Sequence, residues 1–350
     1  MPEPTPDVPP PHRRRPRYRG THPRRFEEKY KERAPEQYPE EVAHVRERGQ
    51  SPAGPLVPIL TEELLAVLAP APGERGVDCT LGYGGHAERV LARLAPGGTL
   101  LALDLDPLEL PRSTARLRAL GHGEEALLTR HTSFAALARV LAEVGWSEGA
   151  DFVYADLGVS SMQLDVPARG FGIKEDGPLD MRMNPARGLS AAAWLARSSP
   201  AELEEILGAH ADEPQAAFLA RALCARRGAL TTTHDLAGAV RAALAGRLVP
   251  EEVERSVRRT FQALRIEVNR ELEALEAWLR QLPQCLRSGG RVAVLTFHSG
   301  EDRRVKHAFQ DGLRAGVYAA GNDEVIRPSP AEQRANPRSS PAKLRWVRRA

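Results

Sequence analysis

A glycine-rich segment, DCTLGYGGHA at residues 78–87, is the first part of the chain whose residue types can bind a ligand. Glycine lets backbone N–H groups approach a ligand at a helix N-terminus, and a helix-forming run follows directly. The spacing of Gly82, Gly84 and Ala87 also satisfies the dinucleotide fingerprint, and Asp104 stands where a ribose-binding carboxylate belongs. The segment therefore predicts a nucleotide-type cofactor; a simple tight turn is the alternative.

Four aspartates are expected at or near the carboxyl ends of parallel strands, where such sheets bind ligands: Asp78, Asp104, Asp106 and Asp156. Two unit charges about 4 Å apart interact by roughly 4 kcal/mol at an effective dielectric of about 20. An acidic crevice therefore favours S-adenosylmethionine, which carries a sulfonium and an ammonium group, over the pyrophosphate of NAD. An NAD-dependent oxidoreductase, which would use the same glycine loop, remains an alternative.

The segment after the fourth predicted strand, DLGVSSMQLD at residues 156–165, begins with an acid and contains a serine pair. Asp156 and Ser160 are expected to face the reactive end of the cofactor, where they can hold an amino group that is to be methylated. We predict both as catalytic residues. A loop followed by a serine-capped turn explains the same spacing equally well.

A second polar cluster follows the last predicted strand and contains His298, Ser299, Glu301 and Asp302. Ser299 and Asp302 have the spacing of a helix cap, so we expect them to begin a helix. His298 and the neighbouring Arg303 are then the better candidates for contacts with the substrate. Since C-x-x-C pairs are lacking, the sequence predicts no metal site.

Short apolar runs alternate with helical ones after Pro55, which predicts a mostly parallel sheet covered by helices. The predicted strands are 76–81, 99–103, 126–128, 152–155 and 291–297. Between 185 and 260 only helical signals occur, among them a capping box at 199–202. Apolar residues from Phe261 to Leu279 recur at steps of three or four and predict one helix, after which Gly289-Gly290 turns the chain into the last strand.

These patterns divide the chain into four segments. We expect a disordered Pro/Arg-rich tail at 1–55, the sheet domain at 56–184 and 261–350, and an inserted helical substrate-recognition subdomain at 185–260. The tail lacks the large aliphatic residues that ordering requires. Its arginines can attract RNA phosphates or simply keep the chain in solution.

The composition excludes several classes of protein. The net charge is only +3, and 42% hydrophobic residues suffice for a buried core. Cys79, Cys224 and Cys285 lie far apart, which argues against a disulfide framework and favours the reducing cytoplasm. No apolar run approaches the roughly 20 residues that span a bilayer, and none follows Met1 as a secretory signal requires.

The last segment of the chain, 327–350, is strongly basic. Its only acid is Glu332, and its cations are Arg327, Arg334, Arg338, Lys343, Arg345, Arg348 and Arg349. They can neutralise RNA phosphates. The alternating stretch 343–347 also fits an edge strand with exposed cations.

Six motifs in a fixed order closely resemble the ribosomal RNA small subunit methyltransferase H family: DCTLGYGGH, DLGVSSMQLD, RGFGIKEDGPLDMRM, TFQALRIEVNREL, FHSGEDRRVK and NPRSSPAKLR. The resemblance extends from about Leu56 to Val347. It implies a class I, Rossmann-like α/β methyltransferase domain that uses S-adenosylmethionine and carries an inserted all-helical subdomain. It further implies methylation of N4 of the cytidine at position 1402 of 16S rRNA, near the decoding site of the small ribosomal subunit.

Matched residue by residue, the resemblance implies cofactor contacts at Gly84, Gly85, His86, Asp104, Phe134, Asp156 and Gln163. Asp104 can accept both ribose hydroxyls, Phe134 can lie against adenine, and the backbone N–H groups of 84–86 can bind the methionine carboxylate. His86 is expected to be a cofactor contact only. Arg169 and Arg182 lie in or beside the loop that matches the family, and we predict that they bind substrate; solvation of that loop is the alternative.

The chain departs from the family pattern at two loops and in its tail. Gly300 stands where the family has leucine in FHSLEDR, and Gly172 stands where it has serine in RGFSF. We expect the glycines to loosen these loops before the next helix. The Pro/Arg-rich tail lies outside the shared pattern. A homo-oligomer and a non-catalytic RNA-binding assembly factor both remain open.

Overall fold

The computed structural model describes residues 50–51, 54–55 and 58–350, and it divides into two units, 1–56 and 57–350. In the first unit, β1 (Gln50–Ser51) and β2 (Gly54–Pro55) pair antiparallel. The rest of the predicted tail lies outside the described residues. All further elements belong to the second unit.

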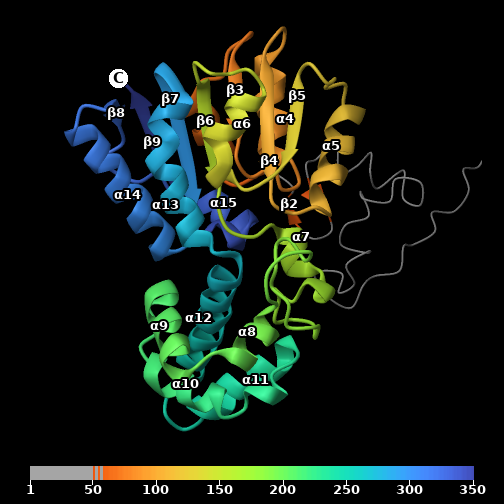
Figure 1. The fold of residues 1–350 in the computed structure, drawn as a ribbon, viewed down its shortest axis with the longest axis vertical. Coiled ribbons are helices and arrows are strands. Elements are labelled where there is room, and N and C mark those ends of the chain that lie inside the picture. Colours follow the sequence, from red (N-terminus) through yellow and green to blue (C-terminus); the bar gives the residue numbers. More distant parts are fainter. Residues whose placement is uncertain (1–49, 52–53, 56–57) are drawn as a thin grey trace, which may run out of the picture. The chain divides into compact units, whose positions relative to one another are not determined.

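Seven strands of the second unit form one sheet in the order β5-β4-β3-β6-β7-β9-β8 (Figure 1). The strands are β3 (Arg75–Asp78), β4 (Thr99–Asp104), β5 (Leu127–His131), β6 (Ala150–Asp156), β7 (Leu286–Thr296), β8 (Tyr318–Gly321) and β9 (Lys343–Arg349). β3 to β7 run parallel, and β9 pairs antiparallel with both β7 and β8. The order reverses between β3 and β6, a switch point that opens a ligand crevice beyond the carboxyl ends of the strands. The predicted α/β fold is confirmed.

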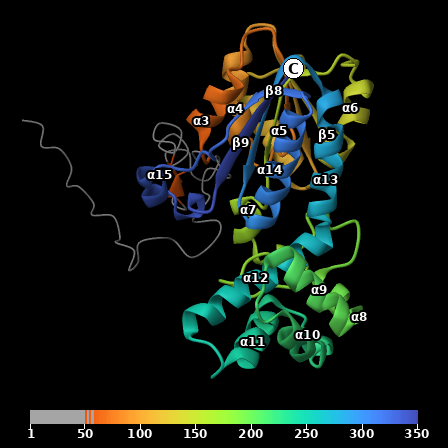
Figure 2. The same ribbon diagram turned by 90° about the vertical axis from the view of Figure 1, so that its left-hand side faces the viewer.

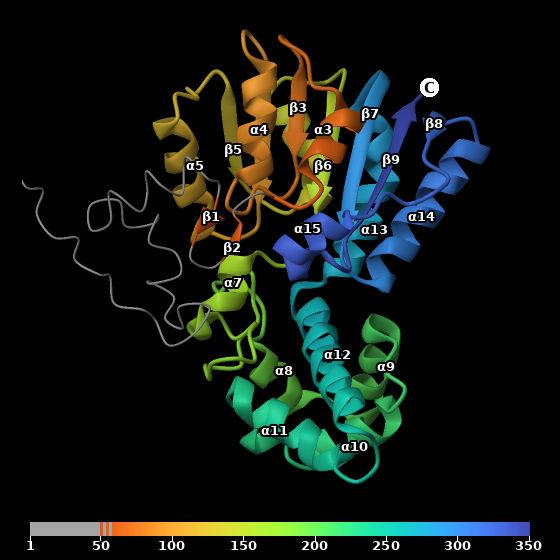
Figure 3. The same ribbon diagram turned by 180° about the vertical axis from the view of Figure 1, so that it is seen from behind.

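Two helical layers cover the sheet, as Figures 2 and 3 show from the side and from behind. One layer holds α3 (Thr61–Leu68), α4 (Gly85–Leu94) and α5 (Glu109–Ala119), and the other holds α6 (Leu137–Glu143), α13 (Glu271–Gln281) and α14 (Ser299–Arg314). Side chains of β4 alternate between the two cores: Leu100 and Ala102 join the first, Leu101 and Leu103 the second. The sheet is therefore buried on both faces, as its continuous apolar strands require.

A helical part hangs below the sheet in Figure 1 and has its own apolar core. It comprises α8 (Ala191–Arg197), α9 (Pro200–Ala211), α10 (Ala216–Cys224), α11 (Thr233–Leu244) and α12 (Pro250–Asn269). The capping box of Ser199 and Glu202 begins α9 as the sequence predicted. The expected boundary between 260 and 261 falls inside α12, which runs unbroken into the region of the sheet domain.

The structure corrects three local predictions. The helix expected over 261–279 is two helices, because Arg270 adopts a left-handed conformation (φ 51°) between α12 and α13. Gly289 and Gly290 lie inside β7, where Gly289 has φ +75° and the pairing with β6 is irregular. β9 is an interior strand, since β8, which was not predicted, forms the edge.

In the described part of the chain, no helix combines the length and the apolar character needed to cross a membrane.

Candidate active site

The glycine loop connects β3 to α4 and turns sharply at Gly84, whose φ of 81° favours glycine. Gly82 N donates to Asp104 Oδ2 at 2.7 Å, which ties the loop to β4. A Cβ on Gly85 would lie 2.5 Å from Pro58 Cγ, so packing also requires glycine there. Gly84 N donates to Leu81 O, and no side chain caps α4. The N–H groups of residues 85 and 86 are therefore the candidates for binding the methionine carboxylate.

Three aspartates gather at the carboxyl ends of β3, β4 and β6, and each has a raised pKa. Burial raises the pKa of Asp78 and of Asp156 to about 7, and Glu301 adds to the shift at Asp156. Burial raises the pKa of Asp104 to about 6. Among the described residues, no lysine or arginine forms an ion pair with any of the three. The crevice therefore holds carboxyl groups that lack a lysine or arginine counter-ion in the described part of the chain.

Asp156 shows most directly that a partner is missing. Its Oδ1 atom is buried and has no hydrogen-bond partner among the described residues. Oδ2 lies 3.5 Å from His86 Nδ1. Because buried polar atoms are nearly always paired, and this one lies at the carboxyl end of β6 beside the glycine loop, it is the candidate acceptor for a ligand donor.

Asp106, which is as buried as Asp78, differs from these three acids in its partners. Arg169 Nη1 donates to its Oδ2 at 2.7 Å and Gln163 Nε2 at 2.9 Å. Gln163 also closes a capping box with Ser160 at the start of α7 (Ser161–Asp165). The predicted cofactor residue Gln163 and the predicted catalytic residue Ser160 are therefore fixed by protein contacts. The sequence placed Asp106 in the crevice but gave no sign of this network.

A cavity of about 330 Å³ lies at the carboxyl ends of β4 and β5. It is lined by Leu105, Arg130, His131, Thr132, Ser133, Arg139, Val140, Glu143, Asn184 and Arg187. Leu105 follows Asp104 in the chain, and Ser133 precedes Phe134. The ring of Phe134 packs edge-on against Trp278, with 5.7 Å between centroids. Asp104 and Phe134, which the sequence assigned to ribose and adenine, are each next in the chain to a residue that lines the cavity but do not line it themselves.

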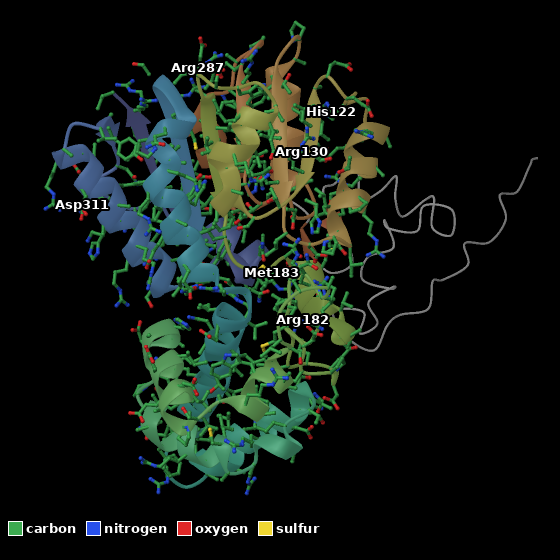
Figure 4. All side chains as sticks on the ribbon, in the orientation of Figure 1. His122, Arg130, Arg182, Met183, Arg287 and Asp311 are labelled. Carbon is green, nitrogen blue, oxygen red and sulfur yellow. The ribbon has the colours of Figure 1, made fainter. Side chains whose placement is uncertain are left out.

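The predicted substrate arginines Arg169 and Arg182 lie on one loop, which Figure 4 marks at Arg182 and Met183. Arg169 is only 11% exposed, and its Nη2 donates to the carbonyls of Arg182 and Met183. Arg182 forms a two-point ion pair with Asp180. Met183 N and Met181 O bind the side chain of Asn269, which holds this loop against the end of α12. Both arginines thus help to order the loop, and their contact with substrate stays a prediction.

The helix cap predicted at Ser299 and Asp302 is wrong by one residue. The capping residues of α14 are His298 and Glu301. Ser299 Oγ instead donates to Asp212 at 2.8 Å, and Arg303 Nη2 binds the same carboxylate at 3.1 Å. His298 and Arg303 therefore stand where α14 meets the end of α9.

Asp302 is occupied by cations of β9. Lys343 Nζ and Arg345 Nε each donate to it at 2.7 Å. Arg345 is buried, so the exposed edge-strand cations expected at 343–347 are not found. Arg338 likewise binds Asp165, which leaves fewer cations of the basic segment for RNA.

The two unusual glycines lie in tighter surroundings than predicted. Gly300 is buried in the first turn of α14, not in a turn before it. A Cβ on Gly172 would lie 2.4 Å from Leu164 O, so this loop is closely packed and not loosened.

A further grouping that the sequence did not predict joins α13 to α14. Ligand-type atoms of Glu271, His298 and Glu301 lie within 4.8 Å of one another. Arg265 donates to both carboxylate oxygens of Glu271 at 2.9 Å, and Glu301 Oε2 accepts from Phe297 N. The carboxylates therefore serve an ion pair and a helix cap.

A Rossmann-like sheet with uncompensated acids at its switch point defines a methyltransferase that uses S-adenosylmethionine. The sequence pattern of the MraW methylase family matches residues 55–350, and the chain belongs to this family. It is 46% identical to the ribosomal RNA small subunit methyltransferase H 1 of Lachnoclostridium phytofermentans, covering 99% of this chain and 96% of that protein. It is 47% identical to methyltransferase H 2 of Alkaliphilus metalliredigens, covering 96% and 97%.

These comparisons decide between two cofactors. The family pattern begins at residue 55, so the predicted tail lies outside it, as expected, while the alignment with the relative from Lachnoclostridium phytofermentans covers 99% of this chain. The NAD-dependent alternative is not supported. The residues fit S-adenosylmethionine. Asp156 Oδ1 has no hydrogen-bond partner among the described residues, and the pKa values of Asp78 and Asp104 are raised because burial disfavours their charged forms. A cationic ligand would stabilise those charged forms.

Proposed function

We propose that this chain methylates N4 of a cytidine in 16S rRNA of the small ribosomal subunit. The observation that carries the proposal is the buried Oδ1 atom of Asp156, which has no hydrogen-bond partner among the described residues and lies beside the glycine loop. The printed names of the relatives, ribosomal RNA small subunit methyltransferase H, and the motifs of the sequence support rRNA as the substrate.

The cofactor is assigned to the predicted residues as follows. The N–H groups of Gly85 and His86 receive the carboxylate, Asp104 the ribose, and the cavity beside Phe134 the adenine. When bound, S-adenosylmethionine supplies an electrophilic methyl group. Arg130, Arg139 and Arg187 border the cavity, where the flanking phosphates of an RNA strand are natural partners.

The task of the protein at the reacting centre is to place the amine and to take its proton. Cytosine N4 is a poor nucleophile because its lone pair is delocalised into the ring, so placement matters most. Asp156 accepts a hydrogen bond from the amino group. Ser160 Oγ already accepts from Gln163 N, yet its O–H remains able to donate to an acceptor on the base.

We assign RNA recognition to the surfaces that flank this crevice. Arg303 is 55% exposed and Arg182 is 22% exposed, and each faces an aspartate that a phosphate can replace. His298 lies near Arg303, where α14 meets the end of α9. The helical part at 185–260 supplies the remaining surface, and because phosphate contacts release counter-ions, binding is expected to weaken steeply with salt.

One assay tests the proposal against its alternatives. The protein is incubated with labelled S-adenosylmethionine and small subunits that lack the modification, and nucleosides are then analysed. We expect N4-methylcytidine with wild-type protein and none with Asp156→Asn. Cofactor binding without label in any RNA would favour an assembly factor, and label on another nucleoside would contradict the assigned substrate.

A further inference from the structure

His86 sits in the first turn of α4 with its ring almost fully buried. Its Nε2 lies 3.0 Å from Ile59 O. A carbonyl oxygen can only accept, so Nε2 carries a hydrogen. The other ring nitrogen, Nδ1, faces Asp156 Oδ2 at 3.5 Å.

At 3.5 Å the two atoms are at the outer limit of a hydrogen bond, and their chemistry favours a proton between the two side chains. In a neutral imidazole whose Nε2 carries hydrogen, Nδ1 is a lone pair, and an ionised Asp156 would oppose it with a second acceptor. Either the carboxyl is protonated and donates to Nδ1, or the imidazole is protonated and donates to the carboxylate. Burial lowers the pKa of His86 and raises that of Asp156 to about 7, which favours the first state near neutral pH.

The groups around the pair are acidic or neutral. Asp78 of β3 and Glu332 of α15 (Pro330–Ala335) act on His86, and Glu301 of α14 acts on Asp156. Glu332 is fixed near His86 because its Oε1 accepts from Leu60 N at 2.8 Å. The ring of Tyr154 meets His86 edge-on at 6.4 Å. Because no arginine or lysine among the described residues pairs with Asp156, its nearest proton partner is His86.

We propose that His86 and Asp156 share one proton, and that this pair receives the proton that the nucleobase amine loses, with His86 as the positioning residue. The inference rests on the proposed function. In the step, a bond forms between N4 and the methyl carbon while the bond from that carbon to sulfur breaks, and the sulfonium becomes a neutral thioether. One N4–H bond breaks, and its proton passes to Oδ1 of Asp156 while the shared proton moves from Oδ2 to Nδ1 of His86. The pair then consists of a neutral carboxyl and an imidazolium, and the positive charge that the sulfonium loses is carried by His86.

The pairing is tested without RNA by NMR of protein labelled with ¹⁵N-histidine. The signals of His86 are identified by their loss in His86→Gln. We expect the Nε2–H tautomer, and a titration midpoint that moves by about one pH unit in Asp156→Asn because the two groups titrate together. An unchanged midpoint would overturn the shared proton, whatever the enzyme methylates.

The role of the pair in methyl transfer is tested with two substitutions of His86, each of which keeps a polar group in the place of one ring nitrogen. Glutamine can keep the donor to Ile59 O, whereas asparagine can keep a polar group near Nδ1. We expect His86→Gln to bind cofactor within about threefold of wild type, yet to lose about 10- to 100-fold in single-turnover methyl transfer. The acid limb of its pH–rate profile should move as well.

The other possible results with these variants would overturn the proposal. A wild-type rate and pH profile in His86→Gln would overturn the proposal, because only the contact with Ile59 would then matter. Full activity in His86→Asn would show that a fixed polar group suffices and that no proton is shared. His122→Gln, at a residue outside the crevice (Figure 4), is the control and should behave as wild type. Absence of methyl transfer by the wild-type enzyme would count against the proposed function alone.

Discussion

Asp156 in the crevice is partly buried and Asp302 at the start of α14 is buried, but their environments are opposite. Burial raises the pKa of Asp156 to about 7. Burial also acts on Asp302, yet hydrogen bonds from Arg345 and Lys343 hold its pKa below the ordinary value. Burial alone therefore does not identify a functional acid. A carboxyl that the fold leaves without a counter-ion opposes folding, and such a group is retained where a ligand supplies the missing charge.

The largest effect on activity is expected from a substitution of Asp156, a crevice acid that has no lysine or arginine partner among the described residues. Asp156→Asn keeps the shape of the side chain but removes the proton acceptor, so we expect methyl transfer to fall by at least about 100-fold. Cofactor affinity should also weaken, because one negative charge leaves the crevice. Stability should not fall, since Asp156 pairs with no lysine or arginine among the described residues and its surroundings disfavour the charged form. Single-turnover kinetics, calorimetry and denaturant unfolding measure the three quantities.

An unfolded or strongly destabilised Asp156→Asn protein would contradict this comparison, because it would show that the carboxyl supports the fold. Full retention of both cofactor affinity and methyl transfer would remove Asp156 from the active site.

The second effect is expected at Asp302, where a substitution should lower stability and leave cofactor binding unchanged. Asp302→Asn leaves the buried Arg345 without its carboxylate, so we expect a loss of roughly 2 to 4 kcal/mol in the free energy of unfolding. Cofactor affinity per folded molecule should stay unchanged. Urea unfolding and calorimetry check both. Asp311→Asn is the matched control on the outer side of the same helix (Figure 4), where the carboxylate is 66% exposed and a change within about 0.5 kcal/mol is expected.

The same contrast explains how much could be predicted from sequence. The strands were found because they are buried on both faces, and Asp78, Asp104 and Asp156 followed because parallel strands end together. The partner of Asp302 could not be found, because Lys343 and Arg345 reach it only through the antiparallel pairing of β9 with β7.

Local rules failed where tertiary contacts override them. The break between α12 and α13 carries no proline or glycine; Arg270 is left-handed, and Asn269 binds Met181 O across the loop. The cap of α14 was misplaced because histidine is an unusual capping residue, whereas the next residue, Ser299, is a common one.

A third effect is the pH dependence of cofactor binding. The ordinary pKa of 3.8 is raised to about 6 at Asp104 and to about 7 at Asp78 and Asp156. Because a cationic ligand needs these groups ionised, we expect affinity for S-adenosylmethionine to rise between about pH 5 and pH 8. S-adenosylhomocysteine lacks the sulfonium charge, so its affinity should rise less. Calorimetry with both ligands measures the difference, and two equal, flat profiles would contradict the role of the acids.

The sign of the accompanying stability change follows from linkage. Acids with a raised pKa bind protons more tightly in the folded state, so their contribution is complete below about pH 4 and is lost as the pH rises through 6 to 7. For Asp302, whose pKa is lowered, stability is instead lost as the pH falls below its ordinary range. The contributions of the crevice acids and of Asp302 to stability should therefore change with pH in opposite directions. Asp78→Asn should reduce only the contribution of the crevice acids.

The smallest stability effect is expected at Arg303. This arginine is 55% exposed and its partner Asp212 is 54% exposed, so solvent screens the pair, and Arg303→Ala should change the unfolding free energy by less than about 1 kcal/mol. If Arg303 binds RNA phosphate, the KM for small subunits rises severalfold and the salt dependence of binding becomes weaker, while kcat stays the same. Steady-state assays at several salt concentrations separate these quantities. An unchanged KM would assign Arg303 to the contact between α14 and α9 alone, because an exposed ion pair of that kind holds two helices without contributing to substrate binding.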